Sequence, residues 1–182
     1  MFTTKHNDRN FDVTHAEHIH PAKTQENVYW DWLNGMRTGE RSADVPSFEE
    51  VERIFFERHY SDYVAGQCAR NAERRHTERN RTIEDLLAGK KTCPEETIYQ
   101  FGTLDEHASV EDLVLVVTEF MSEFHERFGT HVHLLDWALH LDESTPHIHE
   151  RHVFDCENKY GEIAPQQEKA LEALGFDLPH PD

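Results

Sequence analysis

The run HLDESTPHIH, from His140 to His149, combines three imidazoles with two carboxylates in ten residues. Imidazole is the commonest metal ligand in proteins and the usual acid or base near neutral pH. One of the imidazoles precedes a short segment that ends in proline, and the other two follow it at a spacing of two residues. We therefore expect His140, His147 and His149 to hold one metal ion, with positions left open for water or substrate, as in catalytic sites.

Two strands joined by a loop would bring these histidines together. Residues 130–141 and 147–155 are rich in apolar side chains and flank Asp-Glu-Ser-Thr-Pro, a pattern typical of antiparallel strands around a connection. If His140 pairs with His147, then Ala138 pairs with His149. All four side chains then share one face, because residues two apart on a strand point the same way. The small Ala138 would leave room for an ion.

Histidine is frequent enough here that isolated pairs carry little weight, since the chain has 15 histidines in 182 residues. Two further His-x-His pairs, His18/His20 and His131/His133, have no third ligand nearby in the sequence, and we interpret them as surface or core histidines. The same interpretation remains an alternative for the predicted metal ligands.

The run HLDESTPHIH resembles the third motif of the Mob/Pre relaxases of MobV type, which belong to the HUH endonuclease superfamily. Every defined position of the family pattern, His-x-Asp-Glu-x-Thr-Pro-His-x-His, is matched. The amino-terminal run KHNDRNFD, with His6 and Arg9, is similar to the family's His-Asn-x-Arg motif, and Pro21, Thr24 and Asn27 fall where the family has a Pro…Asn segment. Residues 38–101 align only loosely.

This resemblance implies a plasmid mobilisation enzyme that nicks single-stranded or hairpin DNA at the transfer origin of a plasmid or mobile genetic element. Such enzymes keep the 5′ phosphate covalently attached and release a 3′ hydroxyl. By the resemblance, His6 is the nucleophile, with Tyr29 as the fallback, and Arg9 binds a phosphate oxygen. Attack by His6 is chemically admissible because a neutral imidazole has a free lone pair.

The resemblance also implies that the three histidines hold a divalent cation against the scissile phosphate. Glu143 would complete or orient that site, or would transfer a proton, and the sequence leaves both roles open. Three imidazoles favour transition metals over the harder Mg²⁺, so we expect Mn²⁺, with Mg²⁺ or another transition metal as alternatives.

The fold predicted from the remaining patterns is α+β, an antiparallel sheet with flanking helices, as in HUH relaxases. A capping box, Ser47 with Glu50, opens a helix over 48–64, and apolar residues at three- and four-residue spacing predict a second over 110–128. We expect a short strand at 97–101 and a last helix at 165–174. Residues 1–41 would be an irregular, nucleophile-bearing arm with at most one strand, and 95–182 would carry the metal site, all within one domain over 1–182.

The net charge of −18 argues against binding DNA through a wholly basic face. Residues 70–91 are the exception, with seven bases against four acids, which leaves −21 for the rest of the chain. A solvated helix face is an equally good interpretation of this segment. The DNA-binding candidates in it are Arg70, Arg74, Arg75, Arg79 and Arg81.

Composition places few other limits on the function. The three cysteines never form a Cys-x-x-Cys pair, and no apolar run suits a membrane helix or a signal peptide, so we expect a cytoplasmic, bacterial-type protein without membrane contact. Longer members of the resembled family continue into helical regions, so self-association would use parts beyond residue 182.

Two alternatives to an active relaxase remain open: a relaxase-like protein that binds DNA or a partner without catalysis, and a metal-binding protein with no DNA role.

Overall fold

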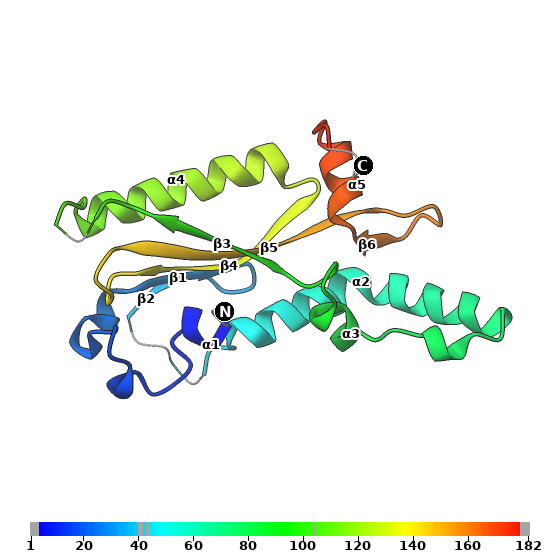
Figure 1. The fold of residues 1–182 in the computed structure, drawn as a ribbon, viewed down its shortest axis with the longest axis horizontal. Helices are drawn as coiled ribbons and strands as arrows, with labels where there is room; N and C mark the ends of the chain where they lie inside the picture. The colour runs from blue at the N-terminus through cyan, green and yellow to red at the C-terminus, as the bar shows by residue number, and fades with distance from the viewer. Residues whose placement is uncertain (1–3, 40–41, 43, 104, 179–182) are drawn as a thin grey trace.

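A computed structural model describes residues 4–39, 42, 44–103 and 105–178, and it has the predicted α+β architecture (Figure 1). Six antiparallel strands form the sheet in the order β2-β1-β4-β5-β3, with β6 paired to β5. The strands are β1 Val28–Asp31, β2 Gly35–Thr38, β3 Glu95–Gln100, β4 Val132–His140, β5 His147–Glu157 and β6 Ile163–Pro165. The α-helices are α1 Thr4–Asn7, α2 Phe48–Glu73, α3 Ile83–Ala88, α4 Val110–Phe128 and α5 Gln167–Ala173.

Helix α4 covers one face of the sheet (Figure 1). Its predicted start is confirmed, because Ser109 caps it by accepting a hydrogen bond from the backbone N–H of Asp112. Leu113, Val117 and Met121 repeat every four residues and are buried against the sheet. The apolar period therefore predicts the position of this helix well.

Helix α2 and the amino-terminal arm lie on the opposite face of the sheet (Figure 1). The predicted capping box is present, with Ser47 and Glu50 each bonded to the other's backbone N–H. Phe55, Phe56 and Tyr60 of α2 pack against apolar side chains from the strands. The two faces of the sheet are thus covered independently.

The prediction of an irregular arm with at most one strand is wrong. Residues 28–38 form a β-hairpin whose second strand begins at Gly35, where φ is +76°. Each strand has only four residues, which is too short for a period-two pattern to emerge. Residues 1–3 and 40–41 of the predicted arm lie outside the described residues.

Other predicted boundaries need smaller corrections. Helix α2 continues to Glu73 rather than ending near 64. The prediction stopped early because residues 65–73 carry no apolar stripe. The sequence patterns also missed α3 and β6, which are short. None of the described helices is both long enough and apolar enough to cross a bilayer.

Candidate metal centre

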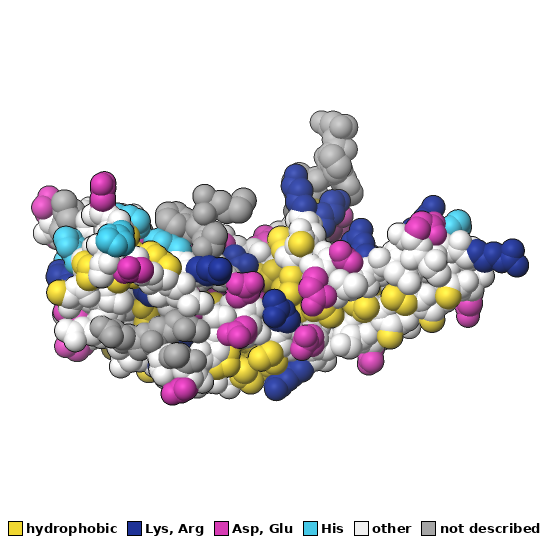
Figure 2. All heavy atoms as spheres, turned by 90° about the horizontal axis from the view of Figure 1, so that it is seen from below, with side chains coloured by type: hydrophobic (Ala, Val, Ile, Leu, Met, Phe, Trp, Pro, Cys, Tyr) yellow, Lys and Arg dark blue, Asp and Glu magenta, His cyan; other side chains and the backbone are white. Residues whose placement is uncertain are grey.

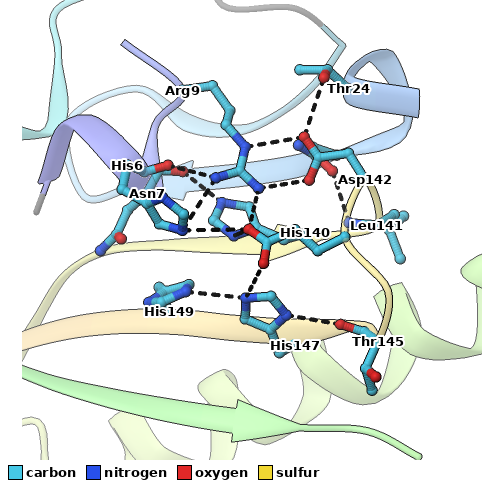
Figure 3. Close-up of polar contacts among 12 residues, drawn as sticks. His6, Asn7, Arg9, Thr24, His140, Leu141, Asp142, Thr145, His147 and His149 are labelled. Carbon is cyan, nitrogen blue, oxygen red and sulfur yellow. Dashed lines mark hydrogen bonds and ion pairs between the residues drawn. The ribbon is translucent and has the colours of Figure 1, made fainter. Parts of the chain in front are cut away.

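The hairpin of β4 and β5 has the predicted register. His140 pairs with His147, and Ala138 pairs with His149. The three predicted metal ligands therefore lie on one face of the sheet, on the side of α1 (Figure 3). Their ring centroids form a triangle with sides of 4.9, 5.1 and 5.3 Å.

His140 presents an unpaired nitrogen at this centre. Its side chain is fully buried, and its Nε2 donates a hydrogen bond to the backbone oxygen of Asn7 at 2.8 Å. Nδ1 is therefore the lone-pair nitrogen, and it has no hydrogen-bond partner among the described residues. Burial, reinforced by the nearby Arg9 guanidinium, holds the pKa of His140 well below its ordinary value. The ring is neutral and ready to act as a ligand.

His147 and His149 are oriented in a similar way. Nδ1 of His147 donates to the backbone oxygen of Thr145 at 2.8 Å, and Nδ1 of His149 donates to Oε1 of Glu96 at 2.6 Å. Both Nε2 atoms then carry lone pairs, and they lie 3.1 Å apart. Two nitrogens bound at about 2.0–2.1 Å to one ion would be separated by roughly 3 Å. The hydrogen bonds to Thr145 and Glu96 fix the tautomers of His147 and His149, as outer hydrogen bonds do for metal-binding histidines.

Glu143 faces the same centre from the loop between the strands. Its carboxylate oxygens lie 3.8 Å from Nδ1 of His140 and 3.9 Å from Nε2 of His147. Burial opposes its ionisation, but hydrogen bonds from His6 and Arg9 outweigh burial and hold its pKa well below the ordinary value. Glu143 is therefore an ionised potential ligand or proton acceptor.

Arg9 is committed to the protein interior rather than to solvent. Its Nε and Nη2 form a bidentate pair with Asp142 at 3.0 and 2.6 Å, and Nη2 also bonds Glu143 at 2.8 Å. Only 5% of Arg9 is exposed. The fork predicted to bind a phosphate oxygen thus already holds Asp142, and the contacts give Arg9 the role of positioning Glu143.

His6 is brought to the histidine cluster from the other end of the chain. Its Nε2 lies 3.4 Å from Oε1 of Glu143 and 3.3 Å from Nη1 of Arg9. Its ring centroid is 5.5 Å from that of His140 and 5.3 Å from that of His149. The amino-terminal motif and the hairpin motif therefore meet at one site (Figure 3).

Several sets of side chains at this site could hold a metal ion. Their ligand atoms lie within 4.8 Å of one another in each of three sets: His6/His140/His149, His140/Glu143/His147 and His6/His18/Glu143. His140 belongs to two of these sets, and its buried Nδ1 has no hydrogen-bond partner among the described residues. The donor set therefore fits a divalent cation that prefers imidazole and carboxylate.

Other predicted site residues lie elsewhere. Tyr29 is 1% exposed, its hydroxyl accepts a hydrogen bond from Asn27, and burial raises its pKa to about 12. This placement argues against Tyr29 as the fallback nucleophile. The five DNA-binding candidates lie on the last turns of α2 and in the segment that follows, away from the histidines. They are Arg70, Arg74, Arg75, Arg79 and Arg81.

Sequence patterns did not identify two residues that organise the centre. Asp142 lies inside the HLDESTPHIH motif, so its acidic character was visible, but its pairing with Arg9 spans 133 positions. Glu96 reaches His149 because β3 pairs with β5, and no local pattern marks it. Asp142 binds Arg9, which in turn bonds Glu143, and Glu96 binds the predicted ligand His149.

Comparison with protein-family models, with curated proteins and with solved structures gave no match for this chain. What the geometry shows is a set of histidine and glutamate side chains that could hold a metal ion.

Proposed function

We propose that this protein is a metal-dependent DNA relaxase, a strand transferase that nicks single-stranded DNA at a transfer origin. The observation that carries the proposal is the meeting of His6 with the cluster of His140, His147 and His149. A potential nucleophile and a potential metal site from opposite ends of the chain are adjacent, as nucleophilic attack on a metal-bound phosphate requires. The motif resemblance supplies the substrate class.

The donor set favours a transition metal such as Mn²⁺ over Mg²⁺, because imidazole is a softer ligand than water or carboxylate. His140, His147 and His149 would hold the ion, with Glu143 beside them. When bound, the cation would offset charge that develops on the non-bridging oxygens of the scissile phosphate.

His6 would act as the nucleophile with one ring nitrogen. A bond forms between that nitrogen and phosphorus, and the bond from phosphorus to the 3′ oxygen breaks. The ring then loses its remaining N–H proton while the 3′ oxygen gains one, so charge is conserved. Glu143, ionised and 3.4 Å from His6, is suited to carry this proton. Arg9 holds Glu143 in place.

The test is to incubate the protein with Mn²⁺ and single-stranded oligonucleotides that carry candidate origins. We expect a covalent adduct between the 5′ phosphate and residue 6, mapped by mass spectrometry. His6→Ala should abolish the adduct, and His147→Ala should abolish it by loss of the metal. The matched control is His15→Ala, because His15 is an exposed imidazole of the same arm that belongs to none of the possible ligand sets. An adduct at another residue, or none with any metal, would refute the proposal.

A non-catalytic relaxase-like protein is the second candidate, and one observation favours it. His6 belongs to a possible ligand set with His140 and His149, so it could serve as a metal ligand instead of a nucleophile. Metal titration of His6→Ala separates the two. Affinity should stay unchanged if His6 is the nucleophile, and should fall by about 10-fold or more if it binds the ion.

A further inference from the structure

A cavity of about 540 Å³ lies between α4 and the strands β1 and β4, apart from the metal centre. Its volume is in the range of about 300–1,000 Å³ typical of small-molecule sites. Trp30, Trp32 and Trp137, which are all the tryptophans of the chain, line it together with Phe55. Aromatic rings therefore form a large part of the cavity wall, and Met36, Met121 and Leu134 complete its apolar part.

Pairing in the sheet holds these rings in place. Trp30 and Trp137 are cross-strand partners on β1 and β4. Trp32 follows β1, packs edge-on against Phe55 of α2 with ring centroids 5.3 Å apart, and donates its indole N–H to the backbone oxygen of Val51. Rings held in this way would lose little conformational entropy on binding a ligand.

The part of the cavity wall formed by Trp30 and Trp137 lies on the sheet face opposite to the histidine cluster, whereas Trp32 and Phe55 line the cavity from the α2 side. Trp137 and Ala138 are neighbours on β4, so their side chains point to opposite faces. Trp137 packs with the residues under α4, whereas Ala138 packs with Tyr29 and Phe48 on the other side. A ligand in this cavity would not touch the metal ligands.

Polar groups at the cavity edge could hydrogen-bond a ligand. Thr118, Ser122 and His125 project from exposed positions of α4, and His133 comes from β4. Nε2 of His133 lies 2.9 Å from Oδ1 of Asp155, which holds that ring in a fixed orientation. Aromatic walls with a few oriented polar groups are typical of sites for planar, partly polar ligands.

The charge of the surroundings narrows the ligand class. None of the residues described as lining the cavity is a carboxylate, and the guanidinium of Arg58 stands 5.2 Å from the Trp32 ring centroid. An anionic group beside Arg58 would be stabilised, which favours a ligand that carries a phosphate as well as a planar ring. A purely aliphatic ligand would leave the polar edge unpaired.

We infer that this cavity binds a nucleobase, stacked on the tryptophan rings with its sugar-phosphate toward the cavity edge. Stacking of a base on an aromatic side chain contributes about 1–3 kcal/mol and tolerates different bases. The base could belong to a free nucleotide or to a DNA strand, because both present the same ring. The inference does not depend on nicking at the metal centre.

Intrinsic fluorescence tests this directly, because every tryptophan of the chain lines the cavity. The protein is kept metal-free with EDTA and titrated with the four deoxynucleoside monophosphates, with deoxyribose 5-phosphate and with a short single-stranded oligonucleotide. We expect saturable quenching by base-bearing probes and none by deoxyribose 5-phosphate. Quenching by mononucleotides assigns the site to a free nucleotide, and quenching by the oligonucleotide alone assigns it to a strand.

A matched pair of variants separates the cavity from the rest of the surface. Thr118→Phe places a ring at the cavity edge, whereas Leu115→Phe adds one at an exposed position of α4 that does not line the cavity. We expect nucleotide binding to weaken about 10-fold or more in Thr118→Phe, because the added ring would exclude a stacked base. Binding should stay unchanged in Leu115→Phe.

Two outcomes would overturn the inference. One is the absence of base-dependent quenching, and the other is equal binding by Thr118→Phe and Leu115→Phe. His147→Ala, which should abolish nicking, should leave the quenching intact because His147 does not line the cavity. Failure of this inference can thus be distinguished from failure of the proposed relaxase activity.

Discussion

Single hydrogen bonds determine which nitrogen each histidine offers at the metal centre. The backbone oxygens of Asn7 and Thr145 and the carboxylate of Glu96 each accept from one ring nitrogen, and the other nitrogen keeps its lone pair. Only Glu96 does so with a side chain, and it is therefore the outer contact that a mutation can test. Burial opposes ionisation of Glu96, but the interactions with His149, Arg151 and Asn7 together lower its pKa below the ordinary value.

Glu96→Gln should weaken metal binding by about 10- to 100-fold, the usual effect of removing an outer partner of a metal-binding histidine. The amide cannot supply the negative charge that favours the present tautomer of His149. Isothermal titration with Mn²⁺ measures the effect. Glu95→Gln, at an exposed neighbouring position, is the control. Equal affinity of Glu96→Gln and the wild-type protein would contradict this role.

A second residue, Asp136, has a buried carboxylate that no hydrogen bond from a described residue stabilises. Its carboxylate oxygens have no hydrogen-bond partner among the described residues, and its exposed fraction is 0%. Burial raises its pKa well above the ordinary value, and the negative charge of Glu52 adds to this while Arg151 opposes it. The native state consequently binds a proton that the unfolded chain releases more readily.

Linkage then sets the sign of the pH dependence. Because the native pKa of Asp136 is raised, its contribution to stability is present at acidic pH and is lost as the pH rises through the native pKa. The free energy of unfolding should fall by up to about 1.4 kcal/mol per pH unit in that window. Asp136→Asn should flatten this slope, as measured by urea unfolding between about pH 5 and 8. The exposed Asp62→Asn should leave it unchanged.

At the scale of elements, α4 illustrates how one face of a helix holds the sheet. Leu113 is 2% exposed and lies in the core under α4, whereas Leu115, two residues later, is 57% exposed. Burial of a leucine side chain contributes about 1.5–3 kcal/mol, and removing it also leaves a cavity. The two positions differ in environment but not in residue type.

Leu113→Ala should lower the free energy of unfolding by about 2–5 kcal/mol, and Leu115→Ala by less than about 0.5 kcal/mol. Chemical denaturation of both variants at one pH gives the comparison. Similar losses in the two variants would mean that α4 does not pack on the sheet through the face described here.

At the scale of the whole molecule, histidine is concentrated more than positive charge is. Figure 2 shows most of the visible histidine side chains gathered at the end that carries the amino-terminal arm, whereas lysine and arginine also lie in the middle and at the opposite tip. Arg79, Arg81, Lys90 and Lys91 line a groove of about 900 Å³ beside α2 and α3, together with the carboxylates Glu78 and Asp85. Arg70 points elsewhere, because Glu162 holds it with two hydrogen bonds of 2.6 and 2.8 Å.

If the groove binds a single strand, its arginines should account for part of the salt dependence of binding. The double variant Arg79→Ala/Arg81→Ala should reduce the slope of log affinity against log salt by about 0.7 for each lost phosphate contact. Arg70→Ala should leave the slope unchanged because that guanidinium is already paired. Fluorescence anisotropy at several salt concentrations measures both. A larger change for Arg70→Ala would reverse this assignment.

The sequence by itself determined that His140, His147 and His149 share one face, and it determined the hairpin register and the position of α4. These features follow from periods of two and of three to four residues, and strand and helix geometry convert such local patterns into faces. Only the tertiary structure decided that His6 meets the triad, that Arg9 binds Asp142, that Glu96 orients His149 and that Tyr29 is buried. Each of these contacts depends on packing between elements distant in the chain, for which local periodicity carries no information.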